Sequence, residues 1–194
     1  MNEKLLSTIR FYFAQSVFMN SIHYKAYDRL NNVQKRNNRI VFWISGITLI
    51  VIILKIMGLE QEFDKLLSIL SFCGLILTGT SLIFSLYNKE DIGEIKCQHR
   101  NIAEEYKILR NRYMFLIEEA MSNAFDEEIL RNKNQIILEQ YNTIGKYAPT
   151  TTGNDYTNAQ NGLGLTVASD EEFTWSDNEI DRFLPKALRI AKED

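Results

Sequence analysis

The chain of 194 residues has a formal net charge of −3, and its mean hydropathy of −0.20 averages two strongly apolar runs with a polar remainder. No basic patch is interleaved with aromatic residues, so we expect no direct binding of nucleic acid. Cys73 lies within the second apolar run and Cys97 lies well beyond its end, so we expect no disulfide between them.

The chain begins with a charged helix over residues 1–39, which we interpret as the first of two cytoplasmic helical stems. No proline or glycine occurs before Trp43, and apolar residues recur mostly at steps of three or four. The positions of this repeat are Leu5, Ile9, Tyr12, Ser16, Met19, His23, Ala26, Leu30 and Val33. No small-residue cleavage site follows the next apolar run, so we expect that run to remain as an anchor.

Two apolar runs, residues 40–59 and 66–87, predict a transmembrane hairpin with residues 60–65 as its turn. At a rise of ~1.5 Å per residue the helices would be ~30 and ~33 Å long, which matches the hydrocarbon core of a bilayer. The first run contains one charge, Lys55, and the second contains none. The alternative is a buried hairpin in a soluble domain, but the remaining residues are too polar to cover two such helices.

Positive charges predict the orientation of this hairpin. The flanking basic residues are Lys25, Arg29, Lys35, Arg36 and Arg39 before the first span, and Lys89, Lys96 and Arg100 after the second. The connecting residues 60–65 contain three acids and one lysine. Because basic residues stay on the cytoplasmic side, we expect both termini in the cytoplasm and the turn on the outer side of the membrane.

Small and hydroxyl residues form a stripe in each span, because their spacing places them on one helical face. The stripe consists of Ser45 and Thr48 in the first span and Ser68, Ser71, Gly74, Thr78, Ser81 and Ser85 in the second. Two interpretations stay open. The stripe packs helix against helix, or it lines a water-filled pore once several hairpins assemble.

Residues 88–145 predict a second cytoplasmic stem and a helix that folds back along it. Apolar residues repeat every 3.5 positions for four heptads, as in a coiled coil. This assembly seam consists of Ile92, Ile95, Ile102, Tyr106, Leu109, Tyr113 and Leu116, with His99 interrupting it. The two stems should lie side by side and antiparallel with their seams paired, and we expect them to set the number of chains in an oligomer.

The returning helix is expected from about residue 126 to residue 143, with Asp126 as its N-cap and Gly145 at its end. From Lys146 to the C-terminus at residue 194 we expect a flexible tail, because the segment after Lys146 is rich in Thr, Asn and Gly without a period. Within this tail, residues 177–192 are helix-prone but interrupted by Pro185. We expect a marginal helix there that docks on a partner or folds only when bound.

No catalytic motif occurs in the chain, and we expect no enzymatic activity, no cofactor and no bound metal. The two histidines, His23 and His99, both fall at seam positions. They could meet across the stems as a proton switch or a metal pair, or each could be a hydrogen-bonded spacer in the core. The spacer interpretation is favoured, because two histidines alone make a poor metal site.

A charged helix that enters a short two-span hairpin and returns as a long helical stem resembles the SLATT family, which comprises prokaryotic two-span effectors associated with nucleotide-signalling and reverse-transcriptase defence systems. The segments that carry this resemblance are YKAYDRLNNVQKRNNRIVFW (residues 24–43), EQEFDK (60–65) and NKEDIGEIKCQHRNIAEEY (88–106). The resemblance covers residues 1–147, leaves the tail outside it and transfers no catalytic residue. It implies an effector that opens or disrupts the inner membrane when an infection sensor fires.

We therefore expect an all-α membrane protein, with a transmembrane helical hairpin, long cytoplasmic helical stems and a flexible C-terminal tail. Its expected function is that of an oligomeric, pore-forming antiphage effector. The expected partners are the lipid bilayer, further copies of the chain, and a cytosolic sensor protein or nucleotide-signal pathway. The alternative is a membrane-anchored scaffold that recruits a cytosolic partner through its stems and tail.

Overall fold

The regular structure in the described part of the chain is helical, which confirms the prediction of an all-α fold. The computed structural model describes residues 3–56, 60–165 and 175–190. In chain order the elements are α1 (Glu3–Ile56), α2 (Glu60–Met121), α3 (Glu127–Tyr147), α4 (Gly153–Leu163), α5 (Asp177–Asp181) and the 3-10 helix η1 (Lys186–Leu188). They fall into two units: a bundle unit, Met1–Tyr27 with Cys97–Asp194, and a hairpin unit, Asp28–Lys96.

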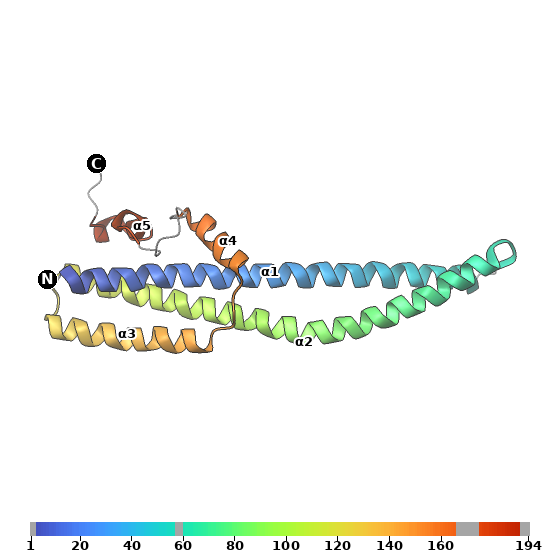
Figure 1. Cartoon of the computed structure of the whole chain (residues 1–194), viewed down its shortest axis with the longest axis horizontal. Coiled ribbons are helices and arrows are strands. Elements are labelled where there is room, and N and C mark those ends of the chain that lie inside the picture. The colour runs from blue at the N-terminus through green and yellow to red at the C-terminus, as the bar shows by residue number, and fades with distance from the viewer. Residues whose placement is uncertain (1–2, 57–59, 166–174, 191–194) are drawn as a thin grey trace. The chain divides into compact units, whose positions relative to one another are not determined.

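In the bundle unit, α3 lies along α2, and the apolar faces of α1, α2 and α3 form one core (Figure 1). The large side chains of this core include Leu5, Ile9, Phe13 and Val17 of α1, Tyr106, Leu109, Tyr113 and Leu116 of α2, and Leu130 and Ile137 of α3. The repeats of the two stems therefore pair as expected. Burial of each large apolar side chain contributes roughly 1.5–3 kcal/mol, so this core stabilises the three-helix arrangement.

The segment after α3 is not uniformly flexible, because it contains α4, which packs on α1 (Figure 1). α4 begins with a capping box in which Thr152 Oγ1 accepts a hydrogen bond from the Asp155 N–H, while the Asp155 carboxylate accepts one from the Thr152 N–H. It ends at Gly164, whose φ of 63° favours glycine. Residues 153–163 are therefore helical, and the prediction of an irregular linker is wrong there.

A buried arginine on α1 holds the last described segment of the chain. The Arg10 side chain is 1% exposed, and its Nη2 lies 2.6 Å from Oδ1 of the buried Asp181 and 3.3 Å from Oδ1 of the exposed Asp177. Arg10 Nη1 also donates to the Leu188 carbonyl at 3.4 Å, and Leu184 is buried in the same core. The segment that we expected to dock on a partner thus docks on α1 of its own chain.

The ends of α3 differ from the prediction. Gly145 lies inside the helix, which continues to Tyr147, and Asp126 occupies the N-cap position without a side-chain capping hydrogen bond. The helix stops because Ala148 precedes Pro149, which disfavours helical backbone in the residue before it. Ala148 accordingly has the extended angles φ −67° and ψ 135°.

The hairpin unit contains the second part of α1 and the first part of α2. Among the described residues, α1 is the one helix long and apolar enough to cross a membrane, and α2 contains a shorter apolar stretch, Ser68–Ile83. The prediction of a turn at residues 60–65 is wrong, because α2 already begins at Glu60. The two helices are connected by residues 57–59, which lie outside the described residues.

Candidate functional site

The two histidines of the chain form a buried pair in the bundle unit. His23 of α1 and His99 of α2 lie at facing positions, with their Nδ1 atoms 2.9 Å apart. Both residues are 1% exposed. At this distance one ring donates its N–H to the other ring, so the neutral pair holds one proton between the two Nδ1 atoms. The structure therefore brings the histidines together as a hydrogen-bonded pair.

Burial keeps His23 uncharged at neutral pH. Desolvation is the main reason why the pKa of His23 is lowered to about 4, and the neighbouring His99 lowers the pKa further. Asp155 of α4 opposes both effects, although its buried carboxylate already accepts hydrogen bonds from the N–H and the hydroxyl of Thr152. Sequence reasoning missed Asp155. The spacing of Thr152 and Asp155, which is typical of a capping box, is the signal that could have placed it.

The geometry of the pair is that of a hydrogen bond. Two imidazole nitrogens bound to one zinc ion at ~2.0–2.1 Å with tetrahedral angles would lie ~3.3 Å apart. The observed separation of His23 and His99 is 2.9 Å. The described residues also contain no group of three His, Cys, Asp or Glu side chains that could hold a metal. The geometry thus favours a shared proton over a shared metal.

Tyrosine rings continue this pair through the core. Tyr106 stacks on His23 with ring centroids 5.8 Å apart, and Tyr141 contacts Tyr106 edge-on at 5.5 Å. Tyr12 contacts Tyr141 at 5.6 Å and Tyr113 at 6.1 Å. Burial raises the pKa of Tyr106 to about 12 and also raises the pKa values of Tyr113 and Tyr141. These rings form an uncharged polar row inside an otherwise apolar core.

In the hairpin unit, the stripe of small and hydroxyl residues is where the two helices meet. Thr78 Oγ1 donates to Thr48 Oγ1 at 3.1 Å, and Thr48 Oγ1 donates to the Ile44 carbonyl at 2.9 Å. A Cβ at Gly74 would lie only 3.1 Å from the Thr48 side chain, so glycine permits the close approach of the helices. This is the packing of membrane helices through small residues.

Side-chain exposure in the second span also separates the stripe from the other faces of the helix. The stripe residues Ser45, Thr48, Ser68, Ser71, Gly74, Thr78, Ser81 and Ser85 are all buried or half-buried. Large apolar residues between them face outward, including Phe72, Leu75, Leu82 and Ile83, which are 52–71% exposed. Within one chain the stripe therefore packs against α1. The lining of a pore stays a prediction.

The predicted assembly seam is largely used inside the chain. Its buried members Tyr106, Leu109, Tyr113 and Leu116 are at most 2% exposed and belong to the core shared with α1 and α3. These residues are therefore covered within one chain, and their role as an assembly surface between copies stays a prediction. Of the others, Ile102 packs on the same core, whereas Ile92 and Ile95 lie in the hairpin unit.

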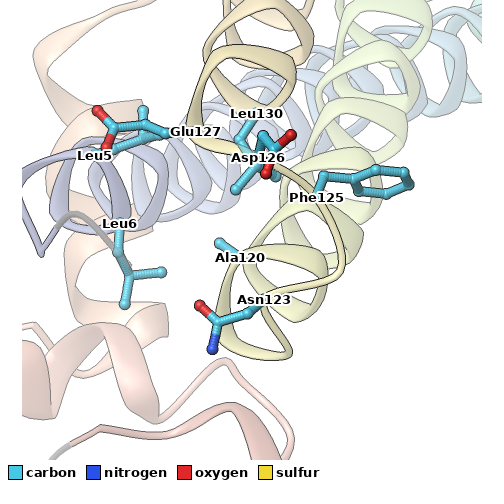
Figure 2. Close-up of a pocket in the computed structure, with 8 residues that line it drawn as sticks. All are labelled: Leu5, Leu6, Ala120, Asn123, Phe125, Asp126, Glu127 and Leu130. Atoms are coloured by element: carbon cyan, nitrogen blue, oxygen red, sulfur yellow. The ribbon is translucent and has the colours of Figure 1, made fainter.

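A pocket of about 510 Å³ opens at the end of the bundle unit where α2 turns into α3 (Figure 2). Its lining residues are Leu5, Leu6, Ala120, Asn123, Phe125, Asp126, Glu127 and Leu130. Asn123 makes the turn with a φ of 51°, a left-handed conformation that asparagine tolerates. Asp126 and Glu127 stand at the first turn of α3, where acids stabilise the helix dipole. This structural role accounts for the acidic wall of the pocket.

Comparison with known proteins decides the family. The model of the SMODS and SLOG-associating 2TM effector domain family 4 matches residues 5–179, which is most of the chain. The chain belongs to this SLATT family. No curated protein and no solved structure matches it. The match confirms the resemblance and extends it beyond Lys146, so the segment with α4 and Asp155 belongs to the domain of the family.

Membership in the SLATT family makes the chain a membrane effector of prokaryotic defence systems. The apolar helices of the hairpin unit agree with the two transmembrane segments that the family description specifies. The exposed apolar side chains of this unit include Phe42, Trp43 and Ile47, which are 59–71% exposed, as expected for a surface that lipid covers.

Proposed function

We propose that this SLATT protein acts against phage by assembling into a pore, or by otherwise disrupting the inner membrane, when a sensor triggers it. The observation that supports a pore is the hydroxyl stripe, which follows one face of α2 while large apolar side chains occupy the others. One hairpin cannot enclose water. Conduction therefore requires several copies with their polar faces turned inward.

The contacts of the stripe represent the closed state in this proposal. The hydroxyls of Thr48 and Thr78 are hydrogen-bonded to one another, so within a single hairpin these groups of the stripe do not face water. An interhelical hydrogen bond in a bilayer contributes only about 0.6 kcal/mol on average, so a modest trigger can offset it. Activation is then a population shift from hairpins closed through the stripe to an assembly whose stripes face a lumen.

Several further parts of the proposal concern topology and partners. Both termini lie in the cytoplasm, where the bundle unit meets a sensor protein or a component of a nucleotide-signal pathway. The other partners are the lipid bilayer and further copies of the chain. The effector needs no enzymatic step, no cofactor and no direct contact with nucleic acid, because opening a membrane requires only a change of packing.

Ion leakage from cells that overproduce the full-length chain tests the pore. Ser81→Leu adds apolar bulk to the stripe and favours dewetting of a lumen. Thr80→Leu makes a similar change on the exposed face of the same helix and is the matched control. We expect Ser81→Leu to reduce potassium efflux about tenfold or more, and Thr80→Leu to leave it unchanged, at equal protein levels.

Equal efflux from Ser81→Leu and the wild type would contradict a pore lined by the stripe. Wild-type protein that releases neither ions nor dye, in cells and in reconstituted vesicles, would overturn the proposal as a whole. The membrane-anchored scaffold would then be the better description.

A further inference from the structure

The bundle unit exposes large apolar side chains on the outer side of α2 and α3. Ile108 and Phe115 of α2 are 52% and 59% exposed, and Ile129 and Ile136 of α3 are 43% and 55% exposed. In each helix the two residues are seven positions apart, which places them on one face. Phe115 and Ile136 line a single groove of about 300 Å³. We call these four residues the outer face.

The surroundings of the outer face have the composition of a protein interface. Two contacts hold the helices together across the groove, since Arg112 donates to Gln140 and Lys133 Nζ lies 2.8 Å from Glu119 Oε1. The other neighbours along the two helices include the uncharged residues Asn111, Ser122, Asn132 and Thr143 and the charged residues Glu118 and Glu139. An apolar centre inside a polar and charged rim is the arrangement of a protein interface.

We propose that the outer face binds the outer face of a second copy of this chain. Charge complementarity supports this partner. Arg112 and Glu139 are both exposed, and neither forms an ion pair within the part of the chain that the structure describes. The hydrogen bond from Arg112 to Gln140 places Arg112 level with Gln140, one position from Glu139. A two-fold axis along the groove therefore sets Arg112 of each copy opposite Glu139 of the other.

This arrangement fits a second copy better than a lipid surface. An anionic membrane attracts a basic rim, whereas the rim of the outer face carries both signs. A two-fold axis along the helices also makes the contact isologous, so that the same surface of each copy is used. The inference rests on the proposed function for the requirement of several copies. The inference places the contact between copies on the outer face, whose side chains are not part of the core of the bundle unit.

The mass of the full-length protein in detergent micelles, measured by light scattering, tests the inference. The variant Phe115→Glu with Ile136→Glu changes two exposed side chains, so its helical content and thermal unfolding should stay as in the wild type. We expect its association constant to fall at least tenfold. Phe11→Glu is the matched control, because Phe11 is 39% exposed on α1 and lies outside the outer face.

A charge reversal gives a second measurement. Arg112→Glu should weaken association about threefold, because it places two carboxylates opposite one another. Adding Glu139→Arg should restore the wild-type association constant, since the pair is then reversed. Failure of this rescue, with both variants folded, would contradict the two-fold arrangement.

Wild-type protein that stays monomeric at all concentrations would overturn the inference, and so would a folded Phe115→Glu/Ile136→Glu variant of wild-type mass. The outcome is separable from that of the proposed pore. A folded Phe115→Glu/Ile136→Glu variant that keeps the wild-type mass and still releases ions would contradict the outer face and leave the oligomeric pore standing. Outer-face dimers that release no ions would contradict the pore alone.

Discussion

Arg10 and His23 are buried polar residues of the same helix, and they meet different neighbours. The Arg10 guanidinium, which does not release its proton, is paired with the Asp181 carboxylate at 2.6 Å. His23 instead faces a second imidazole, and the carboxylate of Asp155 is engaged by Thr152. The pKa of His23 is therefore lowered to about 4, mainly by burial. Of these two residues, only the arginine is charged.

The low pKa of His23 predicts that acid destabilises the bundle unit. The folded pKa of about 4 lies below the ordinary value of 6.5, so the stabilising effect is present above pH 6.5 and is lost as the pH falls toward 4. This loss amounts to about 1–2 kcal/mol between pH 7 and pH 5. The side chain of His23→Gln cannot titrate. In denaturant unfolding, the free energy of unfolding of this variant should therefore fall less between pH 7 and pH 5 than that of the wild type, by this amount. Equal losses in both proteins would contradict the prediction.

The two acids beside Arg10 should differ in importance, because only one of them is buried. Asp181→Asn leaves the buried Arg10 without its closest charge partner, so we expect a loss of about 3–5 kcal/mol in unfolding free energy. Asp177→Asn, whose side chain is 62% exposed, should cost less than about 1 kcal/mol. Hydrogen exchange in residues 177–190 should rise only in Asp181→Asn. A similar rise in both variants would show that the buried pair does not hold this segment.

At the scale of elements, the hairpin unit depends on contact between its smallest side chains. A Cβ at Gly74 would meet Thr48 at 3.1 Å, whereas a Cβ at Gly79 would meet nothing within 4 Å. The two glycines lie in the same helix, so substitution by valine changes the helix propensity equally at both positions. Any difference between the variants therefore reports the packing of α1 on α2.

Gly74→Val should thus destabilise the hairpin unit by about 1–3 kcal/mol more than Gly79→Val does. Unfolding of the purified protein in increasing fractions of a denaturing detergent measures this difference. If both variants unfold at the same detergent fraction, the contact of Thr48 with Gly74 does not contribute to the stability of the folded hairpin.

At the scale of the whole molecule, the two units place their apolar residues differently. The bundle unit buries most of its large apolar side chains among several helices, while the hairpin unit has two helices and leaves most of its apolar surface exposed. Two helices cannot cover one another on all sides. A lipid bilayer would cover this apolar surface and keep it from water, which agrees with membership in a two-transmembrane family.

The asymmetry of basic residues predicts which ends of the molecule face the cytoplasm. In a chain without Cys73 and Cys97, a cysteine at Gln61 should react with a membrane-impermeant maleimide in intact spheroplasts. Cysteines at Asn2 and Asp194 should react only after the membrane is permeabilised. Labelling of either terminus in intact spheroplasts would reverse the predicted orientation.

Local periodicity by itself determined the helical character of the stems, the apolar spans and the face on which each stripe lies. These features depend on residues three, four or seven positions apart, and helix geometry converts such spacings directly into faces. The pairing of the stems and the meeting of His23 with His99 could be expected for the same reason. The end of α3 at Ala148 could also have been read from Pro149, whereas Gly145 was the weaker signal.

Only the tertiary structure decided what each face contacts. An apolar seam looks the same whether it packs on its own chain or on another copy, and the seam around Leu109 proved to be covered by α1 and α3. The contact of Arg10 with Asp181 and the electrostatic interaction of His23 with Asp155 join residues more than 130 positions apart. Helical spacing contains no information over such separations. These contacts exist because folding brings α4 and α5 onto α1 and buries their polar groups there.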